Sequence, residues 1–195
     1  MKVPKFCTYN ADVVQELSKF IYDNSLKDDR LNTFHRSYFH NSLNRLSMSV
    51  DFVNNTIQDG WRYLDVGSFG ILPLMVKKDN PDCSIHCLSY EGNRIGLDQN
   101  GFYETSDPDD GNTIRIDQVD VEHDQYPYPD DYFDFISCFE VLEHLKFSPI
   151  AMMQEIKRVL KPNGILALTT PNINSSKSML KMVCGESPQE CSSFH

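Results

Sequence analysis

Residues 130–172 read DDYFDFISCFEVLEHLKFSPIAMMQEIKRVLKPNGILALTTPN, and this stretch carries the clearest structural pattern of the sequence. An apolar run at 133–139 is followed by an amphipathic segment and then by a second apolar run at 165–170. Runs of this length, rich in β-branched and aromatic residues, are typical of buried strands. The order strand, helix, strand predicts two parallel strands joined by a crossover helix.

The helix between these two runs has clear signals at both ends. Ser148 is expected to cap it, with Pro149 at the first helical position, and Lys161-Pro162-Asn163-Gly164 is expected to end it. The expected buried stripe consists of Ile150, Met153, Ile156, Val159 and Leu160.

The same alternation extends toward the N-terminus. Three further apolar runs are expected to be strands, at 62–66, 84–88 and 113–119. Five strands alternating with helices predict an α/β fold, a mostly parallel sheet with helices on both faces. Between residues 98 and 112 the chain is polar and rich in turn residues, and no regular element is expected there.

Helical patterns flank this core on both sides. Two N-terminal helices are expected, at about 12–22 and 31–57, and they either cover the sheet or form a lid over a substrate. A helical stretch follows at 175–183. We therefore divide the chain into an N-terminal helical segment (1–57), a core (58–172) and a helical tail (173–195).

Composition narrows the functional classes. The net charge of −10 has the wrong sign for binding nucleic acid by charge alone. The six cysteines show no paired C-x-x-C spacing and are expected to be free thiols in a reducing cytoplasm. The sequence has no signal-peptide pattern and no apolar run near the roughly 18 residues that a membrane span needs. We expect a soluble, cytoplasmic protein without nucleic-acid partners.

Ligands of parallel α/β sheets bind beyond the carboxyl ends of the strands. After the first run stands Asp65-Val66-Gly67-Ser68-Phe69-Gly70, where the glycines permit a tight turn into a helix. Such turns are common, so this loop alone is weak support for a cofactor site. A nicotinamide-dependent dehydrogenase is disfavoured, because Phe69 and Leu72 occupy positions where its G-x-G-x-x-G turn needs glycine.

The ordered set from Asp120 to Asn172, with its FEVLEHL and RVLKPNG segments, resembles the class I, Rossmann-like S-adenosylmethionine-dependent methyltransferases. The resemblance begins at about Tyr63 and is strongest to a bacterial branch found beside sugar and cell-envelope biosynthesis enzymes. It implies S-adenosyl-L-methionine as cofactor and a small-molecule acceptor, with a sugar or glycan intermediate as the implied class.

The resemblance also implies roles for individual residues. The methionine moiety of the cofactor would be held by Asp65, Gly67, Ser68, Phe69 and Gly70. Ser89, with Glu91 two residues on, stands where the family places an acidic residue for the ribose hydroxyls, and serine offers only a weaker, uncharged contact. Asp120 and Val121 match the pair that meets the adenine, and Phe139 and Glu140 match the segment beside the methionine end. Asp65 and Asp120 have an alternative interpretation as caps of strand-to-helix turns.

Methyl transfer from a sulfonium is an in-line displacement, so the protein has to align the acceptor and, for a hydroxyl, remove its proton. His144 is the candidate base, with helix capping or a backbone contact as the alternative role. Glu140, Glu143 and His144 are not expected to bind a metal, because Glu143 and His144 are adjacent and no second histidine is suitably spaced.

Complete members of the family end their sheet with a strand hairpin, for which no pattern exists after Asn172. The chain is thus expected to be a fragment, a truncated product or a protein completed by a partner. Its last strand would be an exposed edge, which invites pairing between copies into a homo-oligomer. A non-catalytic cofactor-binding scaffold is the alternative to an enzyme.

Overall fold

The structure is a computed structural model of the chain, and it describes residues 11, 14, 15, 18, 19, 33–67, 70–89, 102–106, 112–172 and 176–185. The strands are β1 (Arg62–Val66), β2 (Ser84–Ser89), β3 (Phe102–Ser106), β4 (Thr113–Gln118), β5 (Phe133–Phe139) and β6 (Leu160–Thr169). The helices are α2 (Thr33–Asn54), α3 (Ile71–Asp79), the 3-10 turn η1 (Leu142–His144), α4 (Ile150–Val159) and α5 (Ser176–Val183).

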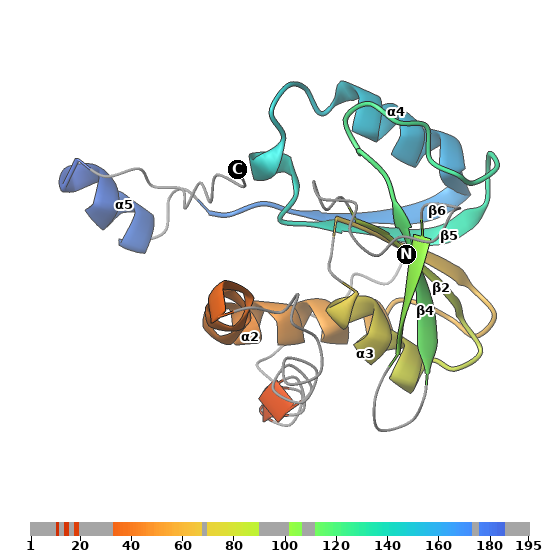
Figure 1. The fold of residues 1–195 in the computed structure, drawn as a ribbon, viewed down its shortest axis with the longest axis horizontal. Coiled ribbons are helices and arrows are strands. Elements are labelled where there is room, and N and C mark those ends of the chain that lie inside the picture. Colours follow the sequence, from red (N-terminus) through yellow and green to blue (C-terminus); the bar gives the residue numbers. More distant parts are fainter. Residues whose placement is uncertain are drawn as a thin grey trace.

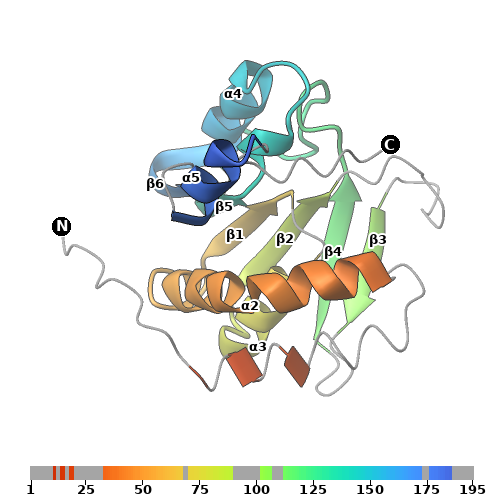
Figure 2. The same ribbon diagram turned by 90° about the vertical axis from the view of Figure 1, so that its left-hand side faces the viewer.

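The described strands form one sheet in the order β3-β4-β2-β1-β5-β6. All neighbouring pairs are parallel except β3 and β4, which are antiparallel. Figure 2 shows β1, β2 and β4 running in one direction and β3 in the other. The expected α/β class and mostly parallel sheet are confirmed.

Alternate residues of the strands enter two separate cores. Tyr63 and Cys87 face a core shared with α2 and α3, whereas Leu64 and Leu88 face a core shared with α4 and the loop after β4. Figure 1 shows α2 and α3 on one side of the sheet and α4 on the other. Strand β5, which is covered on both faces, is accordingly buried at five of its seven positions.

Strand β3 is a correction to the expectation that 98–112 holds no regular element. Its five residues pair antiparallel with β4, from Phe102 opposite Asp117 to Ser106 opposite Thr113. Strand β3 lies at the edge of the sheet and has a neighbouring strand on one side only. Such a short strand needs no long apolar run, and apolar runs are the signal by which strands are recognised in a sequence.

The end of α4 and the start of β6 also differ from expectation. The helix ends at Val159, and Leu160 already pairs with Phe133, so residues 161–164 lie inside β6 as an irregularity rather than as a helix stop. Asn163 takes the left-handed conformation there, with φ of 65°. Residues 161–164 thus form an irregular part of β6 and do not form the C-terminal cap of α4.

The buried face of α4 is rotated from the expected one. Met152, Ile156 and Val159 are buried at helical spacing, while Ile150 is 64% exposed. Pro149 takes the cap position, and the Ser148 hydroxyl lies 3.4 Å from the amide of Ile150 without capping the helix. The sequence of α4 allows two overlapping apolar faces, one that includes Met153 and one that includes Met152. The face that includes Met152 is the one packed against the sheet.

The flanking helices agree with expectation where they are described. The expected helix at 31–57 is α2, and the one at 175–183 is α5. Of the helix expected at 12–22, residues 14, 15, 18 and 19 are described and are helical, and the rest lies outside the described residues. None of the described helices is both long and apolar enough to cross a membrane.

Candidate functional site

The loop between β1 and α3 turns through two left-handed glycines. Gly67 has φ of 85° and Gly70 has φ of 83°, a conformation that other residues adopt only with strain. The Gly67 amide donates to the carbonyl of Leu88 at 2.7 Å, which ties the loop to the end of β2. A Cβ at Gly67 would lie 2.6 Å from Cγ2 of Val141, so the segment after β5 also presses on this loop. Ser68 and Phe69 lie outside the described residues.

A chain of buried polar side chains lies directly beneath this loop. Asp65 on β1 and Ser137 on β5 are register partners, and the Ser137 hydroxyl donates to Oδ1 of Asp65. The Tyr63 hydroxyl lies 2.8 Å from Oγ of Ser137. Asp65 thus lies at the end of β1 and is hydrogen-bonded to Ser137. Tyr63 and Ser137 were not predicted, because no local pattern links residues so far apart in sequence.

The end of β2 contributes Ser89, which is buried and whose carbonyl accepts from the amide of Val119 at 3.1 Å. The site residue Glu91 lies outside the described residues. Ser89 therefore lies next to the carboxyl end of β4, because adjacent parallel strands end at the same edge of the sheet.

Asp120 follows β4 and closes a turn. Its Oδ1 accepts from the amide of Glu122 at 3.0 Å, and its Oδ2 lies 3.1 Å from Nδ1 of His123. The Asp120 side chain thus stabilises a turn, and in the described residues no helix follows this turn before β5. Val121 packs partly buried against the core on the α4 side.

Glu122 links this turn to the segment after η1. Its two carboxylate oxygens accept from the backbone amides of Lys146 and Phe147, at 2.9 and 2.8 Å. Glu122 was not predicted, since a lone glutamate in a polar turn carries no signal.

Glu140 joins three elements at the end of β5. It is in the left-handed conformation, with φ of 57°. Its carboxylate forms an ion pair with Arg45 of α2 and accepts from the Thr169 hydroxyl of β6 at 2.9 Å. Phe139 before it packs partly buried against the core on the α2 side. Arg45 was not predicted, because its partner lies far away in the chain.

The next carboxylate, Glu143 in η1, is set apart by its surroundings. Its Oε2 is buried and has no hydrogen-bond partner within the described part of the chain. Burial raises the pKa of Glu143, and the nearby charge of Glu140 raises it further. His144 beside it is exposed, and its amide donates to the carbonyl of Val141 at 2.9 Å. No group of three acidic, cysteine or histidine side chains in the described residues could hold a metal.

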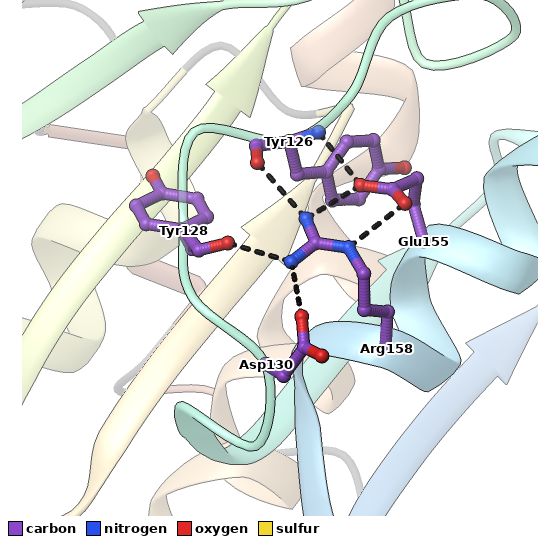
Figure 3. A network of polar contacts seen from close by, with 5 residues as sticks. All are labelled: Tyr126, Tyr128, Asp130, Glu155 and Arg158. Carbon is purple, nitrogen blue, oxygen red and sulfur yellow. Dashed lines mark hydrogen bonds and ion pairs between the residues drawn. The ribbon is translucent and has the colours of Figure 1, made fainter.

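Arg158 of α4 holds the loop between β4 and β5 through the contacts drawn in Figure 3. The same loop carries Asp120. The guanidinium makes five hydrogen bonds, to the carbonyls of Tyr126 and Tyr128, to Asp130 and to both oxygens of Glu155. Five is the full donor capacity of arginine. Glu155 also accepts from the amide of Tyr126 at 2.8 Å. The network fixes the loop to the helix.

A family model described as "Methyltransferase domain" matches residues 35–195. The ubiquinone biosynthesis O-methyltransferase of Haemophilus ducreyi is 33% identical over 81 residues, which cover 40% of this chain and 34% of that protein. The protein of the same name from Actinobacillus pleuropneumoniae serotype 7 is 30% identical over 116 residues, or 53% of this chain and 49% of that protein.

Among solved structures, coclaurine N-methyltransferase bound to N-methylheliamine and SAH matches with a TM-score of 0.49 and 19% identity. That match covers 64% of this chain and 35% of the other. The chain spans about half, or less, of the length of the curated relatives it matches.

Proposed function

Because this chain belongs to the methyltransferase-domain family, we propose that it transfers a methyl group from S-adenosylmethionine to a small-molecule acceptor. The family match over residues 35–195 is the observation that carries the proposal. The curated relatives are named O-methyltransferases, which favours a hydroxyl oxygen as the atom that receives the methyl group. Those names give no support to the sugar or glycan acceptor expected from the sequence.

The chemistry of the site suits this cofactor. S-adenosylmethionine carries a sulfonium and an ammonium, and carboxylates lie at the end of β1 (Asp65), after β4 (Asp120), after β5 (Glu140) and in η1 (Glu143). The buried Oε2 of Glu143, which has no partner in the described part of the chain, is the kind of group that a nearby cation would satisfy. The left-handed turn at Gly67 and Gly70 leads into α3, whose start has no side-chain cap.

We assign the cofactor contacts as follows. The loop at Asp65, Gly67 and Gly70 would hold the methionine end, with Phe139 and Glu140 beside it, and Ser89 would meet the ribose. Asp120 and Val121 would meet the adenine. A carboxylate has about four acceptor positions, and each oxygen of Asp120 has a single partner in the turn. Asp120 therefore keeps acceptor capacity for the exocyclic amine while it caps the turn.

The reactive methyl group is supplied by the cofactor when it is bound. The protein's own task is to align an acceptor hydroxyl and take its proton. We propose His144 as this base, because the 3-10 turn that carries it follows the carboxyl end of β5 and its side chain is exposed.

A partner-completed scaffold is the second candidate function. It is favoured by exposed apolar side chains on β6, where Ile165 and Leu168 are each 38% exposed, and on α5, where Val183 is 84% exposed. Strand β6 is also the last strand of the described sheet. Pairing of two copies along β6 would give a dimer, and a constant monomer mass by light scattering over a hundredfold range of concentration would contradict it.

Calorimetric titration with S-adenosylmethionine and S-adenosylhomocysteine, with NADH as control, tests the proposed function. Micromolar binding of the first two compounds and no binding of NADH is expected. A folded chain that binds neither would contradict an active methyltransferase and favour the scaffold.

A further inference from the structure

The polar chain beneath the β1 loop is unusual for the centre of a sheet. Tyr63, Asp65 and Ser137 are exposed by 0, 1 and 0%. They lie side by side because β1 and β5 are adjacent, with Asp65 opposite Ser137 and Tyr63 two residues earlier on the same face of β1. Buried polar groups are costly unless they are hydrogen-bonded, so each of the three depends on the others.

Both hydroxyl protons in this chain point toward Asp65 when it is ionised. A carboxylate only accepts, so the one proton of the Ser137 hydroxyl goes to Oδ1 of Asp65. The oxygen of Ser137 then accepts from the Tyr63 hydroxyl at 2.8 Å. Burial, and next the charge of Asp65, raise the pKa of Tyr63 well above its usual value, so the phenol keeps its proton. The Tyr63 hydroxyl also hydrogen-bonds to Asp65 itself, and such clusters strengthen cooperatively.

Packing alone does not require these hydroxyls. The ring of Tyr63 meets Phe135 edge-on, with centroids 5.5 Å apart, a contact that phenylalanine would make equally well. Alanine in place of Ser137 would remove a single oxygen from the core. What the two hydroxyls do contribute is hydrogen bonding that orients the Asp65 carboxylate. Asp65 lies two residues before Gly67 of the β1–α3 loop.

We propose that Ser137 and Tyr63 are positioning residues for cofactor binding, because together they hold the Asp65 carboxylate in the orientation that attracts the ammonium of the methionine moiety. The inference rests on the proposed function. It adds two residues on β1 and β5 that do not touch the cofactor themselves. Their contribution is therefore specific to ligands that carry the amino-acid part.

The test compares two ligands by calorimetry. S-adenosylhomocysteine has the ammonium, whereas 5′-methylthioadenosine keeps the nucleoside and lacks the amino-acid part. Because a hydrogen bond to a charged group is lost, Ser137→Ala is expected to weaken S-adenosylhomocysteine binding about tenfold. Tyr63→Phe is expected to weaken it about threefold, since Ser137 still donates to Asp65 in this variant. Binding of 5′-methylthioadenosine is expected to change less than about twofold in both.

Tyr126→Phe is the matched control. Tyr126 is also buried, but it faces the opposite core and its hydroxyl has no hydrogen-bond partner within the described residues. Removal of this hydroxyl should leave the binding of both ligands unchanged. Circular dichroism and thermal unfolding confirm that each variant is folded, and Tyr63→Phe carries the test alone if Ser137→Ala does not fold.

The outcomes separate the two proposals. A parallel loss of both ligands, or no loss of S-adenosylhomocysteine, would overturn the positioning role while the proposed function stands. A folded wild-type chain that binds neither ligand would overturn the proposed function, and the positioning role with it.

Discussion

Glu155 and Arg158 lie one turn apart on α4, and both oxygens of the Glu155 carboxylate accept from the Arg158 guanidinium, at 2.9 and 2.6 Å. This pairing lowers the pKa of Glu155 and raises that of Arg158. The remaining donors of Arg158 hold the loop that begins with Asp120, so a helix on one face of the sheet orders part of the candidate cofactor site.

Arg158→Lys is expected to lower the free energy of unfolding by about 2–4 kcal/mol, because an ammonium has three donors in place of five and cannot form the planar pair with Glu155. Urea unfolding measures the change. Lys157→Ala is the control on the same helix, since Lys157 is exposed, and it should stay within about 0.5 kcal/mol. Equal effects of the two substitutions would contradict a structural role of the network.

His86 is expected to make stability depend on pH. Its ring packs edge-on against Tyr128, Tyr132 and Phe133. Burial lowers the pKa of His86, and Arg115 and Arg62 act in the same direction, against the opposing charge of Asp117. The folded state thus binds this proton less readily than the unfolded state, whose histidine pKa is about 6.5.

Stability should therefore be complete above about pH 6.5 and fall as the pH drops below that value. Urea unfolding at pH 7.5 and pH 5.5 measures the loss, and His86→Phe should reduce it. An identical loss in the wild type and the variant would assign the pH dependence to other groups.

Gly67→Ala is expected to destabilise the fold by about 1–3 kcal/mol and to weaken cofactor binding. The left-handed backbone at this position is strained for alanine, and the new Cβ would also clash with the side chain of Val141. The double variant with Val141→Ala should recover part of the loss, since it relieves the clash and not the backbone strain. Gly60→Ala separates the two effects. Gly60 has φ of 77° but nothing within 4 Å of an added Cβ, so this control should cost about 1 kcal/mol.

Asp120→Ala is expected to weaken S-adenosylhomocysteine binding about tenfold if its carboxylate accepts from the adenine amine. Asp124→Ala is the control, because it weakens the same turn and leaves the Asp120 carboxylate in place. Oδ2 of Asp124 accepts from the amide of Asp120 at 2.9 Å. Calorimetry should find weaker binding for the first variant only. Equal weakening in both would indicate that Asp120 acts by capping.

The elements that sequence analysis predicted well are those whose signal is local. The run at 133–139 and the helix after Pro149 are marked by apolar periodicity and by residues with fixed backbone preferences. Strand β3 was not predicted because it lies at the sheet edge, pairs with β4 alone and contains no long apolar run. The start of β6 was misplaced because residues that stop a helix in isolation lie here against β5.

Within the candidate site, the strand-end residues Asp65, Ser89, Asp120 and Glu140 followed from the order of strands and from family resemblance. Their partners did not. Arg45 meets Glu140 across 95 positions, and Ser137 meets Asp65 across 72, distances at which local sequence patterns carry no information. Glu143 was noted from its motif, but the burial of its Oε2 depends on tertiary packing.

The position of β1 in the sheet has a consequence for how the protein is made. β1 pairs with β2, which follows it closely, and with β5, which is synthesised much later. While the ribosome is still producing the residues between them, one edge of β1 has no neighbour and Asp65 lacks the serine that donates to it. Non-local pairing of this kind slows folding and leaves strand edges open in the meantime. The nascent chain is therefore expected to need its greatest protection by chaperones before residue 139 has emerged.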